Sequence, residues 1–202
     1  MVSNLSHKTF NKDTSIIPQE LIREVIYEKP YYYKDYRKVL NNEKTLEEIM
    51  GSSSLQSGII SALLIHFGFL LKKEYRVLGS EAGLHLNTND NLSLDLAFYK
   101  KADLSPQKFD NHYLVDVPVS VIEVDVSIDL LSPQDQDYVF QKTQRLLDFG
   151  VEQVVWILTK SRKIMIAKPN ETWTVDNWDK EFSFFNQKLI LENFLKEEGI
   201  IV

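Results

Sequence analysis

Two carboxylates lie two residues apart within a strongly apolar run, Val121–Ser127. The β-branched residues of this run predict a strand, and because side chains alternate between the faces of a strand, Glu123 and Asp125 point the same way. Strands this rich in Val and Ile usually lie inside a sheet, where two unpaired carboxylates are costly and repel each other. The pattern therefore suggests a metal site. In the alternative interpretation, the strand ends in solvent and the two acids cap a helix or pair with Lys or Arg.

A third acid, Asp95, interrupts another apolar run, Leu92–Tyr99. A continuous strand over this run would place Leu94, Leu96 and Phe98 on one face and Ser93, Asp95, Ala97 and Tyr99 on the other. If this strand pairs with the Val121–Ser127 strand, Asp95 comes close to Glu123 despite their separation in sequence. Carboxylate oxygens from two neighbouring strands provide the geometry that a hard divalent cation needs.

Lys142 interrupts the apolar stripe of an expected helix over residues 134–149. It follows Val139 by three residues and precedes Leu146 by four, so its side chain lies on the face that packs against the sheet. A lysine aimed at the sheet calls for a carboxylate or phosphate partner. In the alternative interpretation, its stem lies along the edge of the core and its ammonium group reaches solvent.

The remaining pattern predicts the elements that position these residues. Cap candidates at Ser52–Ser54 begin a helix from about Leu55 to Lys72, and Ser132-Pro133 begin the helix that ends at Gly150. Further elements are expected as an N-terminal hairpin over 21–33, short helices near 36–40 and 45–50, strands at 75–78, 82–86, 92–99, 119–126, 154–158, 163–167 and 173–178, and a final helix at 187–197. The order predicts an α/β fold with a mixed central sheet flanked by helices on both faces and the core order helix-strand-strand-strand-helix-strand.

The composition is that of an ordinary globular protein, with 44% hydrophobic and 26% charged residues among 202. We expect a single domain over residues 16–202 and a flexible N-terminus over residues 1–15. The absence of Cys excludes disulfides, thiolate metal sites and cysteine nucleophiles. Without a membrane span or signal peptide, the chain is expected to be cytoplasmic. A net charge of −6 argues against non-specific nucleic-acid binding over the whole surface but allows a local basic groove.

Taken in order, three segments resemble the PD-(D/E)XK nuclease superfamily. They are Leu92–Ala97, Val121–Ser127, and Lys142–Trp156 with its Gly150-Val151-Glu152 exit. More narrowly, the chain resembles the Uma-two family of restriction endonucleases, many members of which are known only as a domain of unknown function. The resemblance covers roughly residues 27–156. It implies a restriction-endonuclease-like fold and metal-dependent cleavage of DNA.

Carried over by position, the resemblance implies a metal site built on Asp95 and Glu123, with the backbone carbonyl of Val124 as the third ligand for Mg²⁺ or Mn²⁺. The superfamily lysine belongs two residues after the glutamate, where this chain has Asp125. That departure matters because the lysine helps to activate the attacking water and to stabilise the charge on phosphorus. Lys142 is the candidate replacement. Asp125 is then either an extra ligand or the salt-bridge partner of Lys142.

Four further residues are secondary candidates. Gln56 stands where the family often has a histidine, and it is either a carbonyl ligand or an exposed residue of the first helical turn. Glu81 could approach the same end of the sheet. Gln141 and Arg145 lie near enough to Lys142 on its helix to contact a phosphate.

The expected function is metal-dependent hydrolysis of a DNA phosphodiester, with catalysis by Asp95, Glu123, Asp125 and Lys142. The resemblance also implies a homodimer, because duplex cleavage needs two active sites. The alternative is a catalytically inactive relative that keeps the nuclease fold as a binding or interaction module, with Asp125 at the lysine position as the mark of lost activity. A third, weaker alternative is an RNA nuclease or a small-molecule phosphodiesterase.

Overall fold

The computed structural model describes residues 17–88 and 90–201, so the expectation for residues 1–15 lies outside the described residues. Its elements in chain order are β1 (Ile22–Ile26), β2 (Lys29–Tyr32), α1 (Tyr36–Leu40), α2 (Glu47–Met50), α3 (Ser54–Leu70), β3 (Tyr75–Leu78), β4 (Ala82–Asn87), β5 (Asp90–Leu94), β6 (Leu96–Lys100), β7 (Ser120–Asp125), α4 (Pro133–Phe149), β8 (Gln153–Leu158), β9 (Lys163–Ala167), β10 (Thr174–Asn177), β11 (Glu181–Phe184), β12 (Gln187–Ile190) and α5 (Leu191–Glu197). Short 3₁₀ turns lie at Gln19–Leu21 and Pro106–Lys108.

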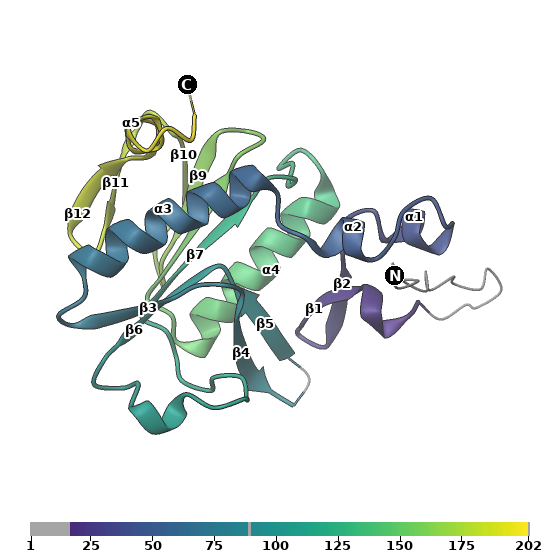
Figure 1. Cartoon of the computed structure of the whole chain (residues 1–202), viewed down its shortest axis with the longest axis horizontal. Helices are drawn as coiled ribbons and strands as arrows, with labels where there is room; N and C mark the ends of the chain where they lie inside the picture. Colours follow the sequence, from purple (N-terminus) through teal and green to yellow (C-terminus); the bar gives the residue numbers. More distant parts are fainter. Residues whose placement is uncertain (1–16, 89, 202) are drawn as a thin grey trace, which may run out of the picture.

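A six-stranded mixed sheet forms the centre, in the order β10-β9-β8-β7-β6-β3. Only the β7–β8 pair, which is joined through α4, is parallel among the pairs of this sheet in the described residues. Helix α3 covers one face of the sheet and α4 covers the other (Figure 1). The predicted fold class is therefore confirmed.

The two long helices begin and end where their capping residues predict. The Ser53 hydroxyl accepts a hydrogen bond from the backbone N–H of Gln56 at the start of α3. At the start of α4, Ser132 caps in the same way and Pro133 occupies the first turn. Helix α4 ends at Gly150, whose φ of 113° is one that a residue with a side chain rarely adopts.

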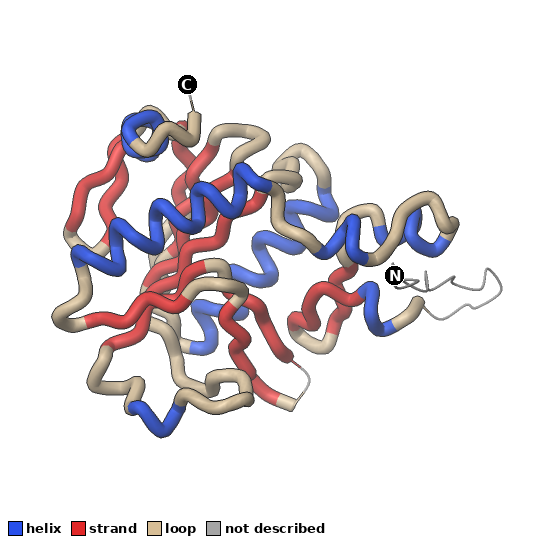
Figure 2. Tube along the Cα trace, viewed as in Figure 1, coloured by secondary structure: helices blue, strands red, loops and turns tan. Residues whose placement is uncertain are grey.

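A second sheet joins the N-terminal hairpin to the core, in the order β2-β1-β5-β4. Strand β1 pairs with β5 through Val25 and Asn91. In Figure 1 the hairpin and the short helices α1 and α2 extend to one side of the central sheet, and Figure 2 shows the helices packed around the strands. Glu24 and Arg23 thus reach the core from an N-terminal strand. Within residues 17–88 and 90–201, none of the helices has the length and apolar character that a membrane span requires.

Two expectations are wrong, one about a strand and one about the last helix. The run Leu92–Tyr99 is not one strand, because a bend at Asp95 divides it into β5 and β6, which belong to different sheets. Leu94 consequently packs on the α4 side of the core rather than with Leu96 and Phe98 on the α3 side. The last predicted helix is also too long: residues 187–190 form β12, which pairs with β11, and the helix starts only at Leu191.

Candidate active site

Asp95 and Glu123 come together across the β6–β7 pair. The antiparallel register places Leu96 opposite Ile122, so Asp95 lies just before β6 at the level of Glu123 in β7. The Asp95 carboxylate accepts a hydrogen bond of 2.7 Å from the backbone N–H of Val124. Both acids are buried, with Asp95 8% and Glu123 2% exposed. The pairing of the two segments that was expected to bring Asp95 close to Glu123 thus occurs.

Lys142 reaches this acid pair from α4. Its Nζ atom donates to Glu123 Oε2 at 2.9 Å, to Glu24 Oε1 at 2.9 Å and to the carbonyl oxygen of Ser93 at 2.8 Å. An ammonium group has three N–H donors, so these three acceptors use all of them. The side chain is 1% exposed. The interpretation in which Lys142 reaches solvent is therefore wrong.

Glu24 is the member of this cluster that the sequence analysis missed. It lies in β1, is 4% exposed, and accepts hydrogen bonds from Lys142, from the backbone N–H of Ser93 at 2.9 Å and from the Tyr138 hydroxyl at 2.8 Å. The one available signal was an acid in the middle of an apolar strand, the same signal that marked Asp95 and Glu123. We call Glu24, Asp95, Glu123 and Lys142 the buried charge cluster.

The electrostatics of the buried charge cluster favour a proton or a cation beside Glu123. Burial raises the pKa of Glu123 to about 8, with Lys142 opposing this rise and the charges of Asp95 and Glu24 adding to it. Burial also raises the pKa of Asp95, against the opposing effect of the Val124 N–H. Burial alone would lower the pKa of Lys142, but the carboxylates of Glu123 and Glu24 raise it well above its usual range.

One oxygen of this cluster has no hydrogen-bond partner among the described residues: the buried Oε1 of Glu123. A buried polar atom without a partner is uncommon and calls for a ligand or a proton. No group of three acidic or histidine side chains converges on a metal position in residues 17–88 and 90–201. A cation at this point would therefore use two carboxylates and a backbone carbonyl.

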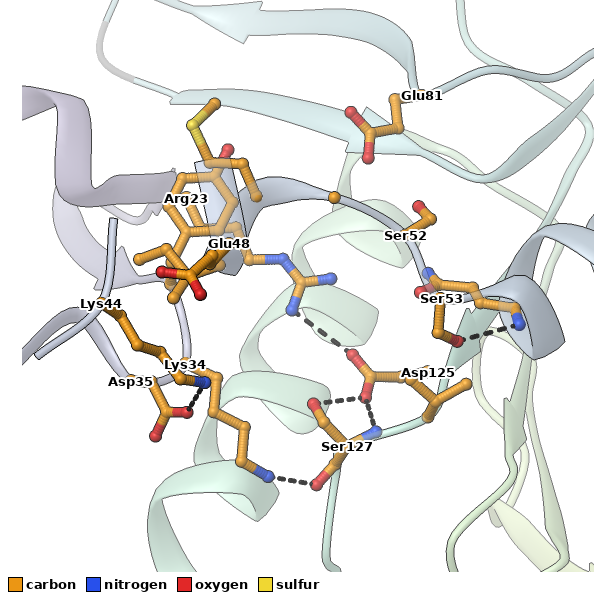
Figure 3. A pocket seen from close by; sticks show the side chains of 16 residues that line it. Arg23, Lys34, Asp35, Lys44, Glu48, Ser52, Ser53, Glu81, Asp125 and Ser127 are labelled. Carbon is orange, nitrogen blue, oxygen red and sulfur yellow. Dashed lines mark hydrogen bonds and ion pairs between the residues drawn. The ribbon is translucent and has the colours of Figure 1, made fainter. Parts of the chain in front are cut away.

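Asp125 does not join the buried charge cluster. Its Oδ1 accepts from the backbone N–H groups of Ser127 at 2.7 Å and Ile128 at 2.8 Å and from the Ser127 hydroxyl at 2.9 Å. Its Oδ2 pairs with Arg23 Nη1 at 3.4 Å (Figure 3). Of the two roles expected for Asp125, the salt bridge with Lys142 is wrong, because Asp125 ends β7 and accepts hydrogen bonds from the turn that follows.

Gln56 contacts the candidate site, though not as expected. Its side-chain Nε2 donates to the carbonyl oxygen of Val124 at 2.9 Å, and its backbone N–H is bonded to the Ser53 hydroxyl. Gln56 is thus neither a carbonyl ligand in this arrangement nor a freely exposed residue. It holds the carbonyl group that the family resemblance assigns to the metal.

The other secondary candidates lie apart from the acid pair. Arg145 donates from Nε to Asp90 at 2.7 Å, which directs its guanidinium toward the turn of the N-terminal hairpin. Gln141 is half-buried and makes no hydrogen bond to Asp95 or Glu123 among the described residues. Glu81 is exposed and lines a neighbouring cavity.

That cavity, of about 210 Å³, opens at the end of β7 and is called the strand-end cavity here. The Arg23 guanidinium projects into its centre, with Asp125 on one side and Glu81 across from it (Figure 3). Its lining also includes Lys34, Lys44, Glu48, Ser53 and Gln56. Glu123 and Asp95 are buried next to it rather than in its wall.

Comparison with known proteins gives a fold but no sequence family. The chain is similar to the crystal structure of a "putative nuclease belonging to DUF820" from Anabaena variabilis, with a TM-score of 0.65 and 13% sequence identity over 91% of this chain and 94% of that one. No family model matches the sequence, and no curated protein matches it either. The likeness establishes a shared fold over nearly the whole chain.

Proposed function

We propose that this protein is a metal-dependent nuclease that hydrolyses phosphodiester bonds of DNA. The observation that carries the proposal is the buried pair of Asp95 and Glu123, in which one oxygen of Glu123 has no partner among the described residues. The fold that holds this pair is similar to that of the protein described as a "putative nuclease". Buried acids whose pKa values are raised mark a candidate catalytic site.

The donor set fits Mg²⁺ or Mn²⁺. The carboxylates of Asp95 and Glu123 and the Val124 carbonyl are hard oxygen ligands, and the unpartnered Oε1 of Glu123 offers a free lone pair. A bound cation would lower the pKa of a water molecule and offset negative charge on the phosphate. Glu123, with a pKa near 8, would lose its proton when the cation binds.

The protein's own residues then have distinct tasks. Lys142 fixes the Glu123 carboxylate, since it donates to Oε2 and leaves Oε1 free. Gln56 fixes the Val124 carbonyl from the opposite face of the sheet. Asp125 holds Arg23 at the strand-end cavity, where its guanidinium is available to an anionic substrate. We include a homodimer in the proposal on the family resemblance alone.

One observation favours a second candidate, a catalytically inactive module that keeps the fold for binding. All three donors of Lys142 are used within the protein, so this lysine cannot contact a phosphate without breaking a buried ion pair. With Asp125 at the usual lysine position, no lysine of the described part of β7 is left for catalysis. In this case the cluster serves stability alone.

Metal binding and DNA cleavage by matched variants separate the two candidates. Mn²⁺ and Mg²⁺ binding is measured by calorimetry on the wild type, Asp95→Asn, Glu123→Gln and a control, Asp179→Asn, which alters an exposed acid. The same samples are incubated with supercoiled plasmid and with circular single-stranded DNA.

If the protein is a metal-dependent nuclease, Asp179→Asn should behave as the wild type. Asp95→Asn and Glu123→Gln should lose both metal binding and cleavage. Metal binding without cleavage of either DNA would leave the metal site intact and remove the nuclease assignment. No metal binding at millimolar concentration would favour the inactive module.

A further inference from the structure

A second and larger cavity, of about 590 Å³, lies beside the strand-end cavity. The segment 29–37, which comprises β2 and the start of α1, forms one wall, and the first turns of α4 form the other. We call it the hairpin cavity. The two cavities share Arg23, Tyr33, Lys34, Asp35 and Ser127 in their linings, so they adjoin along this boundary. A ligand that extends from one to the other passes Arg23.

Tyrosine rings line the hairpin cavity. Tyr32 and Tyr36 are stacked, with ring centroids 4.8 Å apart and planes inclined by 27°. Tyr31 is fixed differently: its ring packs against Tyr138 and its hydroxyl donates to Asp137 at 2.7 Å. All of the tyrosines of segment 31–36 are only half-buried. Such rings can stack with a flat heteroaromatic group that enters the cavity.

Two of the three acids that line the hairpin cavity are paired with cations. Asp35 pairs with Lys38 at 3.1 Å and with Lys44 at 2.7 Å. Asp137 pairs with Lys29 at 2.6 Å. The remaining acid, Asp135, accepts the backbone N–H of Asp129 near the start of α4.

Two exposed cations are left at the rim. The Lys34 ammonium donates to the Ser127 carbonyl at 2.6 Å, and the Arg37 guanidinium donates to the Tyr36 hydroxyl at 3.2 Å. Neither makes an ion pair with an acid among the described residues. Arg23, at the boundary, has one long ion pair among the described residues, with Asp125. Within a chain of net charge −6, this gives a local surface of cations interleaved with aromatic rings.

We propose that the hairpin cavity binds one or two unpaired nucleotides of single-stranded DNA, whose backbone continues past Arg23 into the strand-end cavity. The bases stack on the Tyr32–Tyr36 pair, and the phosphates contact Lys34 and Arg37. Duplex DNA does not fit this role, because its bases are stacked on each other and do not expose their faces. The inference rests on the proposed function, since it names the form of the substrate that approaches the same site.

The test is fluorescence anisotropy with a labelled oligothymidylate of about 12 nucleotides, in a buffer with EDTA so that no cleavage occurs. Tyr32→Ala should weaken binding by about 5- to 100-fold, which is the effect of losing one base stack, and Tyr32→Trp should restore it. Lys34→Ala and Arg37→Ala should each weaken binding and reduce the salt dependence of log K by about 0.7, the share of one phosphate contact on a single strand.

Matched controls keep the result specific. Lys38→Ala removes a cation whose charge is already paired with Asp35, and Tyr113→Ala removes an exposed tyrosine outside the cavity. Both should bind as the wild type does. A labelled blunt duplex should bind more weakly than the single strand, and thermal unfolding should show that every variant is folded.

Equal affinity of the wild type and the Tyr32, Lys34 and Arg37 variants would overturn the inference, as would tighter binding to the duplex. The outcome is independent of the nuclease assignment. If the single strand binds through these residues but Mn²⁺ produces no cleavage, the inference stands and the proposed function fails. If cleavage occurs and these variants bind normally, only the inference fails.

Discussion

Glu123 and Asp125 occupy the same face of β7, two residues apart, yet the protein uses them differently. Glu123 is enclosed between the sheet and α4, where burial raises its pKa to about 8 and one of its oxygens has no partner in the described structure. Asp125 ends the strand, where three donors from the next turn satisfy one oxygen and Arg23 pairs with the other. Both acids are buried, with Glu123 2% and Asp125 4% exposed, so the hydrogen-bond donors that each acid finds, rather than its depth, separate a candidate ligand from a structural cap.

The largest effect on the free energy of unfolding is expected from removing the lysine that contacts Glu123. Lys142→Met removes the only cation that contacts both Glu24 and Glu123 in the described structure, and leaves the two acids in an apolar setting. The free energy of unfolding should fall by about 3–5 kcal/mol, measured by urea denaturation at pH 7. Lys73→Met, at an exposed position, should change it by less than about 0.5 kcal/mol. A loss below about 1 kcal/mol for Lys142→Met would mean that the cluster is open to water.

The next effect, which is smaller for each single pH unit, is expected from pH in the metal-free protein. The pKa of Glu123 rises from 4.5 to about 8 on folding, so the folded state keeps a proton that the unfolded state releases within this range. This contribution to stability is present below pH 4.5 and is lost as the pH rises through 8. The wild type should therefore lose stability relative to Glu123→Gln by up to about 1.4 kcal/mol per pH unit. Parallel urea curves at pH 5, 6, 7 and 8 measure the difference, and a constant difference would show that Glu123 stays charged.

The smallest effect is expected at Asp125. Asp125→Asn keeps an oxygen that can accept from the turn and loses only the charge that pairs with Arg23, whose side chain is 31% exposed. It should cost about 0.5–1 kcal/mol of unfolding free energy and change the affinity for Mn²⁺ by less than about twofold. Calorimetry on the folded variant measures its affinity for Mn²⁺. A large loss of Mn²⁺ affinity would place Asp125 among the ligands and remove the contrast with Glu123.

Local signals in the sequence were enough to predict much of the fold. Ser53, Ser132 and Gly150 limit α3 and α4 because caps act within a few residues of the chain. Alternation predicted that Glu123 faces away from Ile122 and Val124, and pairing of its strand with the Asp95 segment predicted that the two acids meet.

The parts that were missed depend on contacts between distant segments. The bend at Asp95 has no local signal, because Leu94 and Leu96 on either side are equally apolar and only their packing in two different sheets separates β5 from β6. Glu24 became a partner of Lys142 only because the N-terminal hairpin joins β5. Strand β12 was predicted as helix because residues 187–190 continue the apolar spacing of α5, and its pairing with β11 decides the outcome.

The most direct test of the central claim is the number of protons released when Mn²⁺ binds. Calorimetric titrations of the wild type at pH 7, in buffers with different enthalpies of ionisation, measure this number. Because the pKa of Glu123 is about 8, the account predicts release of about one proton and an affinity that increases roughly tenfold per pH unit up to pH 8. Glu123→Gln should bind no Mn²⁺. Binding that releases no proton, or that survives in Glu123→Gln, would contradict the claim that Glu123 is the metal ligand of this site.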